Sequence, residues 1–336
     1  MAPTRQPFDA VILVGFGGPQ SRDDIRPFLA NVLRGRRIPQ ERLDDVVHHY
    51  EMFDGVSPLT AITMQQAEGL RRRLADTGVP VFLGMRNWHP YLEDTFIEMA
   101  DAGVRRALAV PLAAHHSYSS CGQYKQNVTQ ALAAVREGGR DAPHVTYVPG
   151  WHTHAGFIDA NARHVGEALE TLPTDLRDAA RIVFTAHSIP AAMANESHYE
   201  AELNESAALV ASRLGRRDWA LVFQSRSGRP QDPWLGPDIC DYLRSERGLR
   251  AVVVSPIGFV ADHIEVLYDL DHEAADVCRE VGIDMRRAAS VNDNPAFLDA
   301  LAEVVGATTR RYATGVPLPI VSAVAPVRPE LAPPMR

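Results

Sequence analysis

Cysteine is scarce in this sequence, with three residues in 336, at positions 121, 240 and 278. Thiols spaced this widely form no CxxC pair and indicate a chain that folds without disulfides in a reducing compartment. Long apolar runs are also missing, because no uninterrupted stretch reaches the roughly 18 residues that a membrane-spanning helix needs. These two absences predict a cytoplasmic globular protein with no integral membrane segment.

Positive charge does not dominate the chain. Lys and Arg number 34 against 42 Asp and Glu, which gives a net charge of −8. An acidic balance argues against nucleic-acid binding, because that function depends on basic surface. Hydrophobic residues at 46 % and charged residues at 23 % are typical of a folded protein. A chain of 336 residues is long enough for two domains.

Two common catalytic motifs are absent. The glycine cluster at 15–18 lacks the third glycine of the dinucleotide fingerprint GxGxxG, and arginines stand where its acidic ribose-binding residue would follow. No GxSxG nucleophile elbow occurs anywhere in the chain. Nucleotide binding and serine hydrolysis are therefore poorly supported.

Short apolar runs alternate with longer helical patterns almost from end to end. Runs that are apolar throughout are typical of strands in a parallel sheet covered on both faces, so we predict doubly wound α/β domains. The expected strands are Ala10–Gly15, Val79–Met85, Arg106–Leu112, Val145–Val148, Arg181–Ala186, Trp219–Gln224 and Arg250–Ser255. The expected helices are Asp23–Leu33, Ala61–Ala75, Tyr91–Ala102, Tyr124–Val135, Gly156–Leu172 and Glu200–Leu214.

The strand pattern also suggests where the chain divides. Four expected strands precede Pro149 and three follow it, so we predict an N-terminal lobe over 8–149 and a C-terminal lobe over 150–312. Residues 315–336 hold many prolines and little charge, which predicts an irregular tail.

Polar side chains stand where two of the expected strands end. His187 follows the fifth strand, and Asp262, His263 and Glu265 follow the seventh. In open α/β sheets ligands bind beyond the carboxyl ends of the strands. A lone histidine at a strand end is most often structural, but a carboxylate at a second strand end favours a functional pair. Such a pair suits a borderline cation such as Fe²⁺ or Zn²⁺, or proton transfer.

Acidic residues recur at four-residue spacing after the seventh strand. Glu265, Asp269 and Glu273 would stack on one face of a helix. Like charges so placed repel by a few tenths of a kcal/mol per pair, and a solvated acidic face is the ordinary interpretation. The alternative is a ladder of oxygen ligands that leads a divalent cation toward Glu265.

Histidine pairs form the last group of candidates. His115 and His116 are adjacent, and His152 and His154 form an HxH. Neither pair has a cysteine or a third histidine at metal-binding spacing nearby. We therefore expect these residues to lie on the surface or to line a cleft.

Several segments together resemble one family. They are Ala186-His187-Ser188-Ile189-Pro190, Gln224-Ser225-Arg226-Ser227-Gly228, Pro233-Trp234-Leu235-Gly236-Pro237-Asp238 and the run PIGFVADHIEVLYDLDHE over Pro256–Glu273. In this order they resemble ferrochelatase, and the match extends from about Asp9 to Val305. The resemblance implies two similar Rossmann-like lobes with an active-site cleft between them.

The resemblance also implies an activity and a site. Ferrochelatases insert Fe²⁺ into a tetrapyrrole, so His187 and Glu265 would bind the metal and accept the pyrrole protons from opposite sides of the macrocycle. Which of the two takes protons and which delivers metal is left open. Asp262 and His263 resemble a supporting polar shell, and a metal path would follow Asp269 and Glu273.

Porphyrin-binding residues are implied in the first half of the chain. Tyr50, Ser57 and Tyr124 match positions that hydrogen-bond propionates, and Arg34 would add positive charge. Phe16 follows the first strand and would lie against one face of the porphyrin near the metal.

This chain departs from the family pattern at several points. Phe16 replaces the tyrosine of some members, so no phenolate is available to iron, and His49 stands where some relatives have arginine. No cysteine follows Cys278, so we expect no [2Fe–2S] cluster and no other permanently bound cofactor. Met52-Phe53 is a poor membrane anchor.

These departures resemble the branch that uses coproporphyrin III, and they indicate a monomer. Protoporphyrin IX is the alternative substrate, and a non-catalytic haem- or tetrapyrrole-binding protein is a third possibility. The expected partners are the tetrapyrrole, Fe²⁺ and a transient protein of the haem pathway.

Overall fold

The computed structural model describes residues 6–35, 39–227, 229 and 231–315. The irregular tail expected from residue 315 onward lies, apart from Gly315, outside the described residues. No helix in the described ranges is long and apolar enough to cross a bilayer.

The first sheet has four parallel strands in the order β2-β1-β3-β4. These are β1 (Ala10–Gly15), β2 (Val81–Met85), β3 (Arg106–Pro111) and β4 (His144–Tyr147). Alternate residues of the wholly buried β1 point to opposite faces. Ile12 packs with helices α4 (Leu92–Asp101) and α5 (Gln123–Glu137), and Leu13 packs on the side of α3 (Pro58–Arg73). Both faces are therefore covered, as its uniformly apolar sequence predicts.

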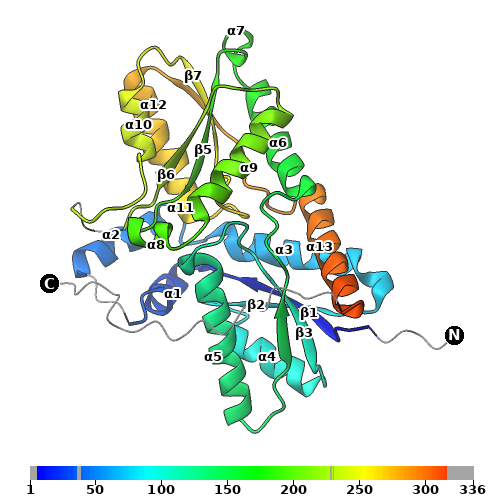
Figure 1. Ribbon diagram of the computed structural model, residues 1–336. Helices are drawn as coiled ribbons and strands as arrows, with labels where there is room; N and C mark the ends of the chain where they lie inside the picture. Colours follow the sequence, from blue (N-terminus) through cyan, green and yellow to red (C-terminus); the bar gives the residue numbers. More distant parts are fainter. Residues whose placement is uncertain (1–5, 36–38, 228, 230, 316–336) are drawn as a thin grey trace.

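The second sheet repeats this topology in the order β6-β5-β7-β8, again with all strands parallel. Its strands are β5 (Arg181–His187), β6 (Trp219–Gln224), β7 (Ala251–Ser255) and β8 (Asp284–Arg287). One face packs with α6 (Ala155–Glu170) and α9 (Tyr199–Arg213), and the other with α10 (Ile239–Ser245) and α12 (Ala275–Val281). The expected α/β fold with two similar Rossmann-like lobes is confirmed, and Figure 1 shows the second lobe above the first.

β8 is a strand that the sequence pattern did not predict. It pairs only with β7 and lies at the edge of its sheet, and all four of its residues are partly exposed. An edge strand needs no continuous apolar run, so the polar segment DMRR carries no strand signal.

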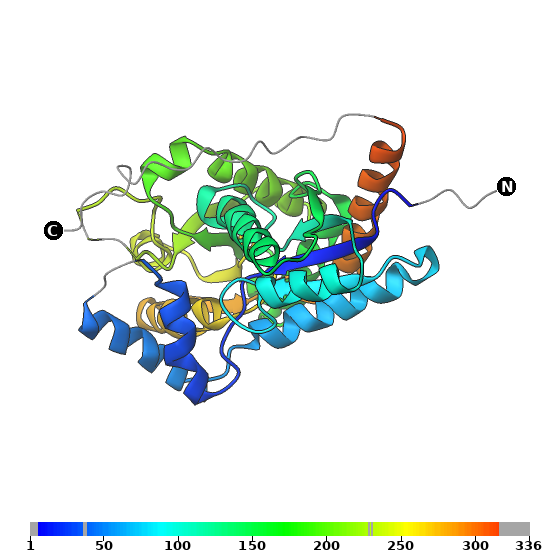
Figure 2. The same cartoon turned by 90° about the horizontal axis from the view of Figure 1, so that it is seen from below.

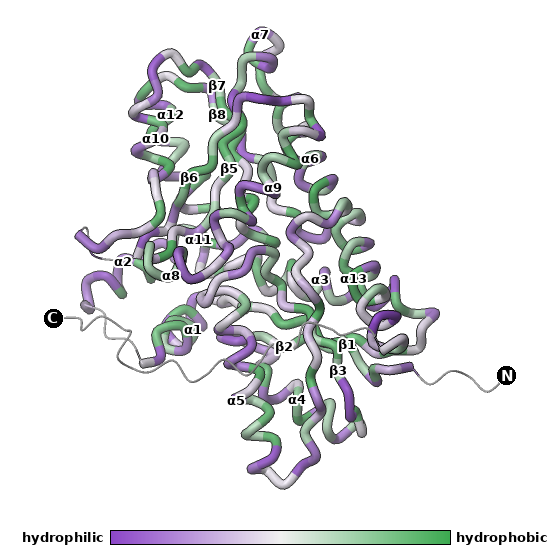
Figure 3. Tube along the Cα trace, in the orientation of Figure 1, coloured by the Kyte–Doolittle hydropathy of each residue, from purple (hydrophilic) through white to green (hydrophobic). Residues whose placement is uncertain are grey.

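The remaining helices lie mostly at the lobe boundary and the surface. In Figure 3 hydrophobic colouring concentrates on the strands, while the outer turns and loops are largely hydrophilic. The expected helices formed within a few residues of their predicted ends. Helices that were not predicted are Gln40–Glu51, Thr174–Arg177, Ala191–Asn195, Ile239–Ser245, Ala275–Val281 and Pro295–Ala313. The other elements are η1 (Arg22–Asp24), α1 (Ile25–Val32), α2 (Gln40–Glu51), η2 (Ala75–Thr77), η3 (Tyr118–Gly122), α7 (Thr174–Arg177), α8 (Ala191–Asn195), α11 (Ile264–Val266), η4 (Leu267–Ala274) and α13 (Pro295–Ala313).

Helix α13 joins the two lobes. It packs against α3 of the first lobe and α6 of the second, as Figures 1 and 2 show. Its buried Phe297 belongs to one apolar cluster together with Leu13 of β1 and Phe184 of β5. At the same boundary, the Gln66 amide donates to the carbonyls of Val260 and Asn292, both at 2.8 Å. The lobes thus share a continuous core, and the division at residue 149 stays a prediction.

Candidate active site

His187 is the last residue of β5, and its ring orientation is set by a backbone carbonyl. Its Nδ1 lies 2.5 Å from the Ser188 oxygen. A carbonyl can only accept, so Nδ1 carries the proton and the neutral ring keeps a lone pair on Nε2. The Tyr199 hydroxyl donates to the His187 carbonyl at 3.2 Å and holds the strand end from the other side. His187 therefore presents Nε2 as a base or a metal ligand.

The Glu265 carboxylate lies opposite the Nε2 lone pair of His187. It lies in α11, which follows β7, the neighbour of β5 in the sheet. The distance from His187 Nε2 to Glu265 Oε2 is 3.8 Å, which is too long for a direct hydrogen bond. The side chains are 34 % and 52 % exposed, so a substrate can reach both. The structure brings together the two residues that the sequence selected at separate strand ends. A separation of 3.8 Å leaves no room for a macrocycle between them, so the expectation that they lie on its opposite sides is wrong.

Two neighbours of Glu265 have structural partners. His263 caps α11, since its Nδ1 accepts from the Val266 N–H at 3.1 Å, and burial lowers its pKa and keeps the ring neutral. Asp262 pairs with Arg287 at 3.1 Å and accepts from Asn292 at 3.0 Å. Burial acts to raise the pKa of Asp262, but this guanidinium and the hydrogen bonds outweigh it and lower the pKa. Both residues shape the turn that presents Glu265.

Asp269 lies in η4, a π-helical segment in which the Ala275 N–H bonds to the Leu270 carbonyl five residues back. Sequence spacing predicted an ordinary α-helix here. Because a π turn holds more residues than an α turn, carboxylates four apart stay closer to one face, and π segments recur at functional sites. The acidic ladder of Glu265, Asp269 and Glu273 is thus carried by an unusual backbone.

Burial dominates the chemistry of Asp269. It raises the pKa of Asp269 to about 7, with the charges on Glu265 and Glu273 adding to the effect. Hydrogen bonds act in the opposite direction, from the Ser225 hydroxyl and from the Gln224 amide at 3.2 Å. Asp269 therefore changes its charge near neutral pH.

Glu273 stands at the outer end of the acidic ladder. Burial raises its pKa, and Asp238 adds to the rise. Both residues line a surface hollow of about 480 Å³. The other lining residues are Cys240, Asp241, Arg244, Asp276, Val277 and Glu280, so acidic groups dominate this opening.

The first lobe contributes aromatic side chains beside the carboxylates. Phe16 and Tyr50 both pack edge-on against Phe28, with ring centroids 6.3 and 5.9 Å away. Burial raises the pKa of the Tyr50 hydroxyl, and the charge on Glu265 adds to it, so Tyr50 stays protonated. Across the same boundary His49 stacks on Tyr268 of η4 at 3.6 Å.

Three implied porphyrin contacts have other partners in this structure. Arg34 is exposed and donates to Asn31 at 2.8 Å, and Ser57 is buried and caps α3. Tyr124 is buried beneath the Arg86 guanidinium, whose carbon lies 4.9 Å from the ring centroid. Burial raises the pKa of Tyr124, and Arg86 acts to lower it. The roles of Arg34, Ser57 and Tyr124 toward propionates stay predictions.

Some site residues were missed from the sequence. Gln224 and Ser225 bond Asp269, and Ser225 has a positive φ of 59°, which is uncommon for a residue other than glycine. Their position at the end of β6 was a usable signal, because that end borders the His187 strand. Tyr199 and Arg287 act from distant segments, and nothing in their local sequence marks them.

Comparisons with known proteins agree with this geometry. The ferrochelatase family model matches residues 8–309. The coproporphyrin III ferrochelatase of Mycolicibacterium smegmatis is 44 % identical over 305 residues, covering 89 % of each chain. The protein of the same name from Streptomyces coelicolor is 44 % identical over 318 residues, covering 89 % of this chain and 85 % of the relative.

A solved structure shows the same fold. SirB from Bacillus subtilis with Fe³⁺ superimposes with a TM-score of 0.56 at 12 % identity, covering 91 % of this chain and 97 % of SirB. The family match spans both sheets and includes His187 and Glu265. The chain belongs to the ferrochelatase family, whose enzymes insert a metal ion into a porphyrin.

Proposed function

We propose that this enzyme inserts Fe²⁺ into coproporphyrin III to give Fe-coproporphyrin, with His187 and Glu265 as the catalytic pair. The observation that carries the proposal is the approach of His187 Nε2 to the Glu265 carboxylate, 3.8 Å apart with both side chains accessible. Both atoms are acceptors, and an N–H group or a cation between them would satisfy both.

Metallation requires two pyrrole protons to leave while iron exchanges water for four ring nitrogens. His187 suits the first task, because its Nε2 lone pair is free while Nδ1–H is bonded to Ser188. Glu265 suits the second, because it is the inner end of the acidic ladder and its charge offsets the desolvation of the cation. We therefore assign proton acceptance to His187 and metal delivery to Glu265.

The metal route follows the ladder. An incoming Fe²⁺ would meet Glu273 and Asp238 at the acidic hollow, then Asp269, and then Glu265. Each step offers oxygen ligands that replace lost water. Ser225 and Gln224 orient Asp269 but leave it a carboxyl oxygen outside their hydrogen bonds.

The first lobe would form the porphyrin wall. Tyr50 supplies aromatic surface near Glu265, and Phe16 and Tyr50 both pack against Phe28. Arg34, Ser57 and Tyr124 would meet propionates after rearrangement of their present partners. Four propionates on coproporphyrin III give Arg34 more to bind than the two of protoporphyrin IX.

The preference for coproporphyrin III is supported by the names of the two relatives reported above. The test is anaerobic Fe²⁺ insertion with coproporphyrin III and protoporphyrin IX measured side by side. We expect kcat/KM to favour coproporphyrin III by at least about tenfold, the effect of roughly 1.4 kcal/mol in transition-state binding. Equal or reversed values would assign protoporphyrin IX as the substrate. Tight product binding without turnover of either porphyrin would indicate a haem-binding protein.

A further inference from the structure

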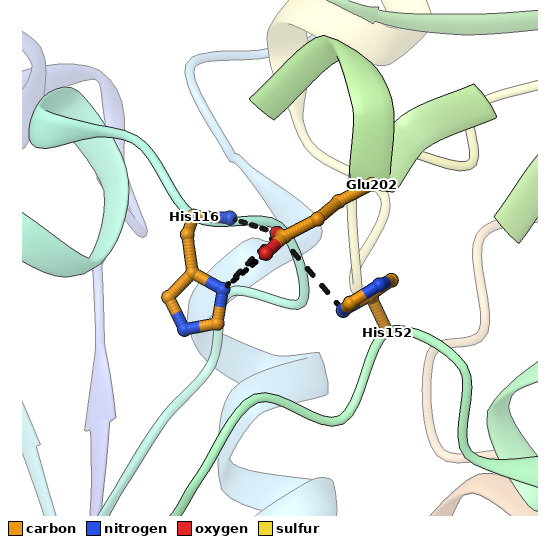
Figure 4. Close-up of side chains that lie close together, drawn as sticks. All are labelled: His116, His152 and Glu202. Atoms are coloured by element: carbon orange, nitrogen blue, oxygen red, sulfur yellow. Dashed lines mark hydrogen bonds and ion pairs between the residues drawn. The ribbon is translucent and has the colours of Figure 1, made fainter. Parts of the chain in front are cut away.

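A second group of metal-ligating side chains lies outside the acidic ladder and comes from three segments far apart in the sequence. His116 follows β3, His152 lies between β4 and α6, and Glu202 is on α9. Figure 4 shows the two imidazoles and the carboxylate converging. One ligand atom from each lies within 4.8 Å of the others. Sequence spacing placed these histidines on the surface or in a cleft because their third partner, Glu202, is distant along the chain.

His152 has the bonding pattern of a metal ligand. Its Nε2 lies 3.0 Å from Glu205, and a carboxylate accepts, so Nε2 carries the proton of the neutral ring. Its Nδ1 is buried and has no hydrogen-bond partner among the described residues. Metal-binding histidines commonly donate their second N–H to a carboxylate in this way.

The bare Nδ1 of His152 faces an acceptor. Glu202 Oε2 lies 4.0 Å away, beyond hydrogen-bond range. The buried Nδ1 of His152 therefore has no donor, and a buried acceptor without a partner is costly. A cation bound to both Nδ1 and Glu202 Oε2 would remove that cost.

His116 and Glu202 complete the arrangement. Glu202 accepts from the His116 backbone N–H at 2.6 Å, and His116 Nδ1–H donates to its other oxygen at 2.9 Å, a hydrogen bond whose proton a bound metal ion would replace. Tetrahedral metal bonds of about 2.0–2.1 Å place neighbouring ligand atoms about 3.3 Å apart. The distances from Glu202 Oε2 to the Nδ1 atoms of His116 and His152, 3.0 and 4.0 Å, bracket this value. The His116 side chain is 40 % exposed, so an ion can enter from solvent.

A third imidazole lies beside the cluster, since buried His115 has its ring centroid 6.1 Å from that of His152. The Ser206 hydroxyl donates to a backbone carbonyl, and its oxygen accepts from His115 Nε2 at 3.0 Å. His115 Nδ1 is therefore a second buried imidazole nitrogen without a partner in the described part of the chain.

We propose that His116, His152 and Glu202 form a second metal site, which takes a divalent transition-metal ion such as Zn²⁺ and leaves one position open to water. Two nitrogens and one oxygen match sites for Zn²⁺ and similar ions, whereas Mg²⁺ and Ca²⁺ prefer oxygen alone. The ion exchanges with solvent and is separate from the iron that His187 and Glu265 would handle.

The site joins the two lobes near the catalytic histidine. His116 belongs to the first lobe and Glu202 to the second. Glu202 is one helical turn after Tyr199, whose hydroxyl holds the His187 carbonyl. An ion bound here therefore fixes the start of α9 against the first lobe, so it raises the thermal stability of the whole chain.

The test uses full-length protein with His187→Ala and Glu265→Gln, so that the catalytic pair binds no metal. We expect this protein to bind one Zn²⁺ per chain by titration calorimetry. When Co²⁺ is added in place of Zn²⁺, we expect the visible absorption bands of a nitrogen-ligated Co²⁺ ion. His152→Ala or Glu202→Gln in that background weakens binding at least about tenfold, and Glu205→Gln weakens it by a comparable factor. His198→Ala and Glu200→Gln, at the exposed N-cap and in the first turn of α9, are the matched controls and leave affinity unchanged.

Two results would overturn this site. The first is the absence of stoichiometric Zn²⁺ binding in that background, which would reduce the cluster to a hydrogen-bonded network. The second is unchanged affinity after replacement of His152 or Glu202. If either variant unfolds, His116→Ala replaces it, since that side chain is partly exposed. A Zn²⁺-dependent rise in Tm of the protein with His187→Ala and Glu265→Gln gives an independent measurement. Neither measurement depends on iron insertion.

Discussion

At the scale of single residues, the position of one proton on His187 governs the chemistry available to this site. Ser188 holds that proton on Nδ1, and Nε2 is left as the acceptor that faces Glu265. The other neutral tautomer, with its proton on Nε2, would present N–H to the carboxylate instead of a lone pair. The backbone carbonyl thus keeps a base available beside a carboxylate.

We predict that His187→Ala and Glu265→Gln each lower the rate of iron insertion by about 10²–10⁴-fold, the usual effect of losing a proton-transfer group. Porphyrin binding should change little, because the aromatic wall remains. Single-turnover metallation and fluorescence quenching measure the two effects. His198→Ala, an exposed histidine, is the control. Near-normal rates in both variants would refute the assignment of the pair.

Phe16 offers a second prediction at this scale. The Arg86 guanidinium carbon lies 5.5 Å from the Phe16 ring centroid, so a hydroxyl placed there would ionise more readily. We expect Phe16→Tyr to give the ferric product complex a phenolate ligand and to slow product release. Resonance Raman spectroscopy of the variant and the unmodified enzyme measures the ligand, with Phe53→Tyr as control. Indistinguishable spectra would show that Phe16 does not face the metal.

At the scale of elements, the proposed metal route through η4 predicts a metal affinity that depends on pH. Below about pH 7 Asp269 is neutral and binds cations weakly, because burial raises its pKa to about that value. The KM for Fe²⁺ should therefore rise as the pH falls from 8 to 6, and Asp269→Asn should flatten this dependence. Asp269→Asn with Glu273→Gln should raise the KM for Fe²⁺ more than that for porphyrin. An unchanged metal dependence would make the ladder a solvated acidic face.

The same carboxyl makes a signed prediction for stability. A pKa raised from 3.8 to about 7 means that the folded state favours the protonated form. This contribution to stability is complete below pH 4 and is lost as the pH rises through 7. Asp269→Asn should therefore raise Tm more at pH 8 than at pH 5. The corresponding gain in the free energy of unfolding is up to a few kcal/mol larger at pH 8. Exposed Asp241→Asn is the matched control in thermal unfolding.

The segment between β7 and α11 crosses the end of β5 closely at Gly258. A Cβ there would lie 2.8 Å from the Ala186 Cα, immediately before His187. We predict that Gly258→Ala displaces the strand end, destabilises the fold by about 1–3 kcal/mol and lowers iron insertion. Chemical unfolding and activity measure the two effects. Gly166→Ala, with only Leu214 at 3.8 Å, should be neutral or stabilising. Equal behaviour of the two variants would contradict this prediction.

At the scale of the whole molecule, the cysteines are dispersed. Cys121 is in the first lobe, and Cys240 and Cys278 are on α10 and α12 of the second. Three thiols cannot supply the four ligands of a [2Fe–2S] cluster. We predict that the purified enzyme has no cluster absorption and no acid-labile sulfide. Sulfide at two equivalents per chain would contradict this and would require other ligands.

The sequence alone determined the features that depend on local pattern. Uniformly apolar runs predicted seven of the eight strands in the described part of the chain, because strands buried on both faces admit few polar residues. His187 and Glu265 were identified because catalytic groups gather at the carboxyl ends of parallel strands. The resemblance carried by PIGFVADHIEVLYDLDHE supplied the family.

The tertiary structure decided what depends on distances between remote segments. The edge strand β8 has no apolar pattern, and only its pairing with β7 defines it. The raised pKa of Asp269 arises from burial beside Ser225 and Glu265, and the meeting of His116 with Glu202 arises from the docking of two lobes. Such properties follow from which surfaces pack together, so no period or motif within one segment can encode them.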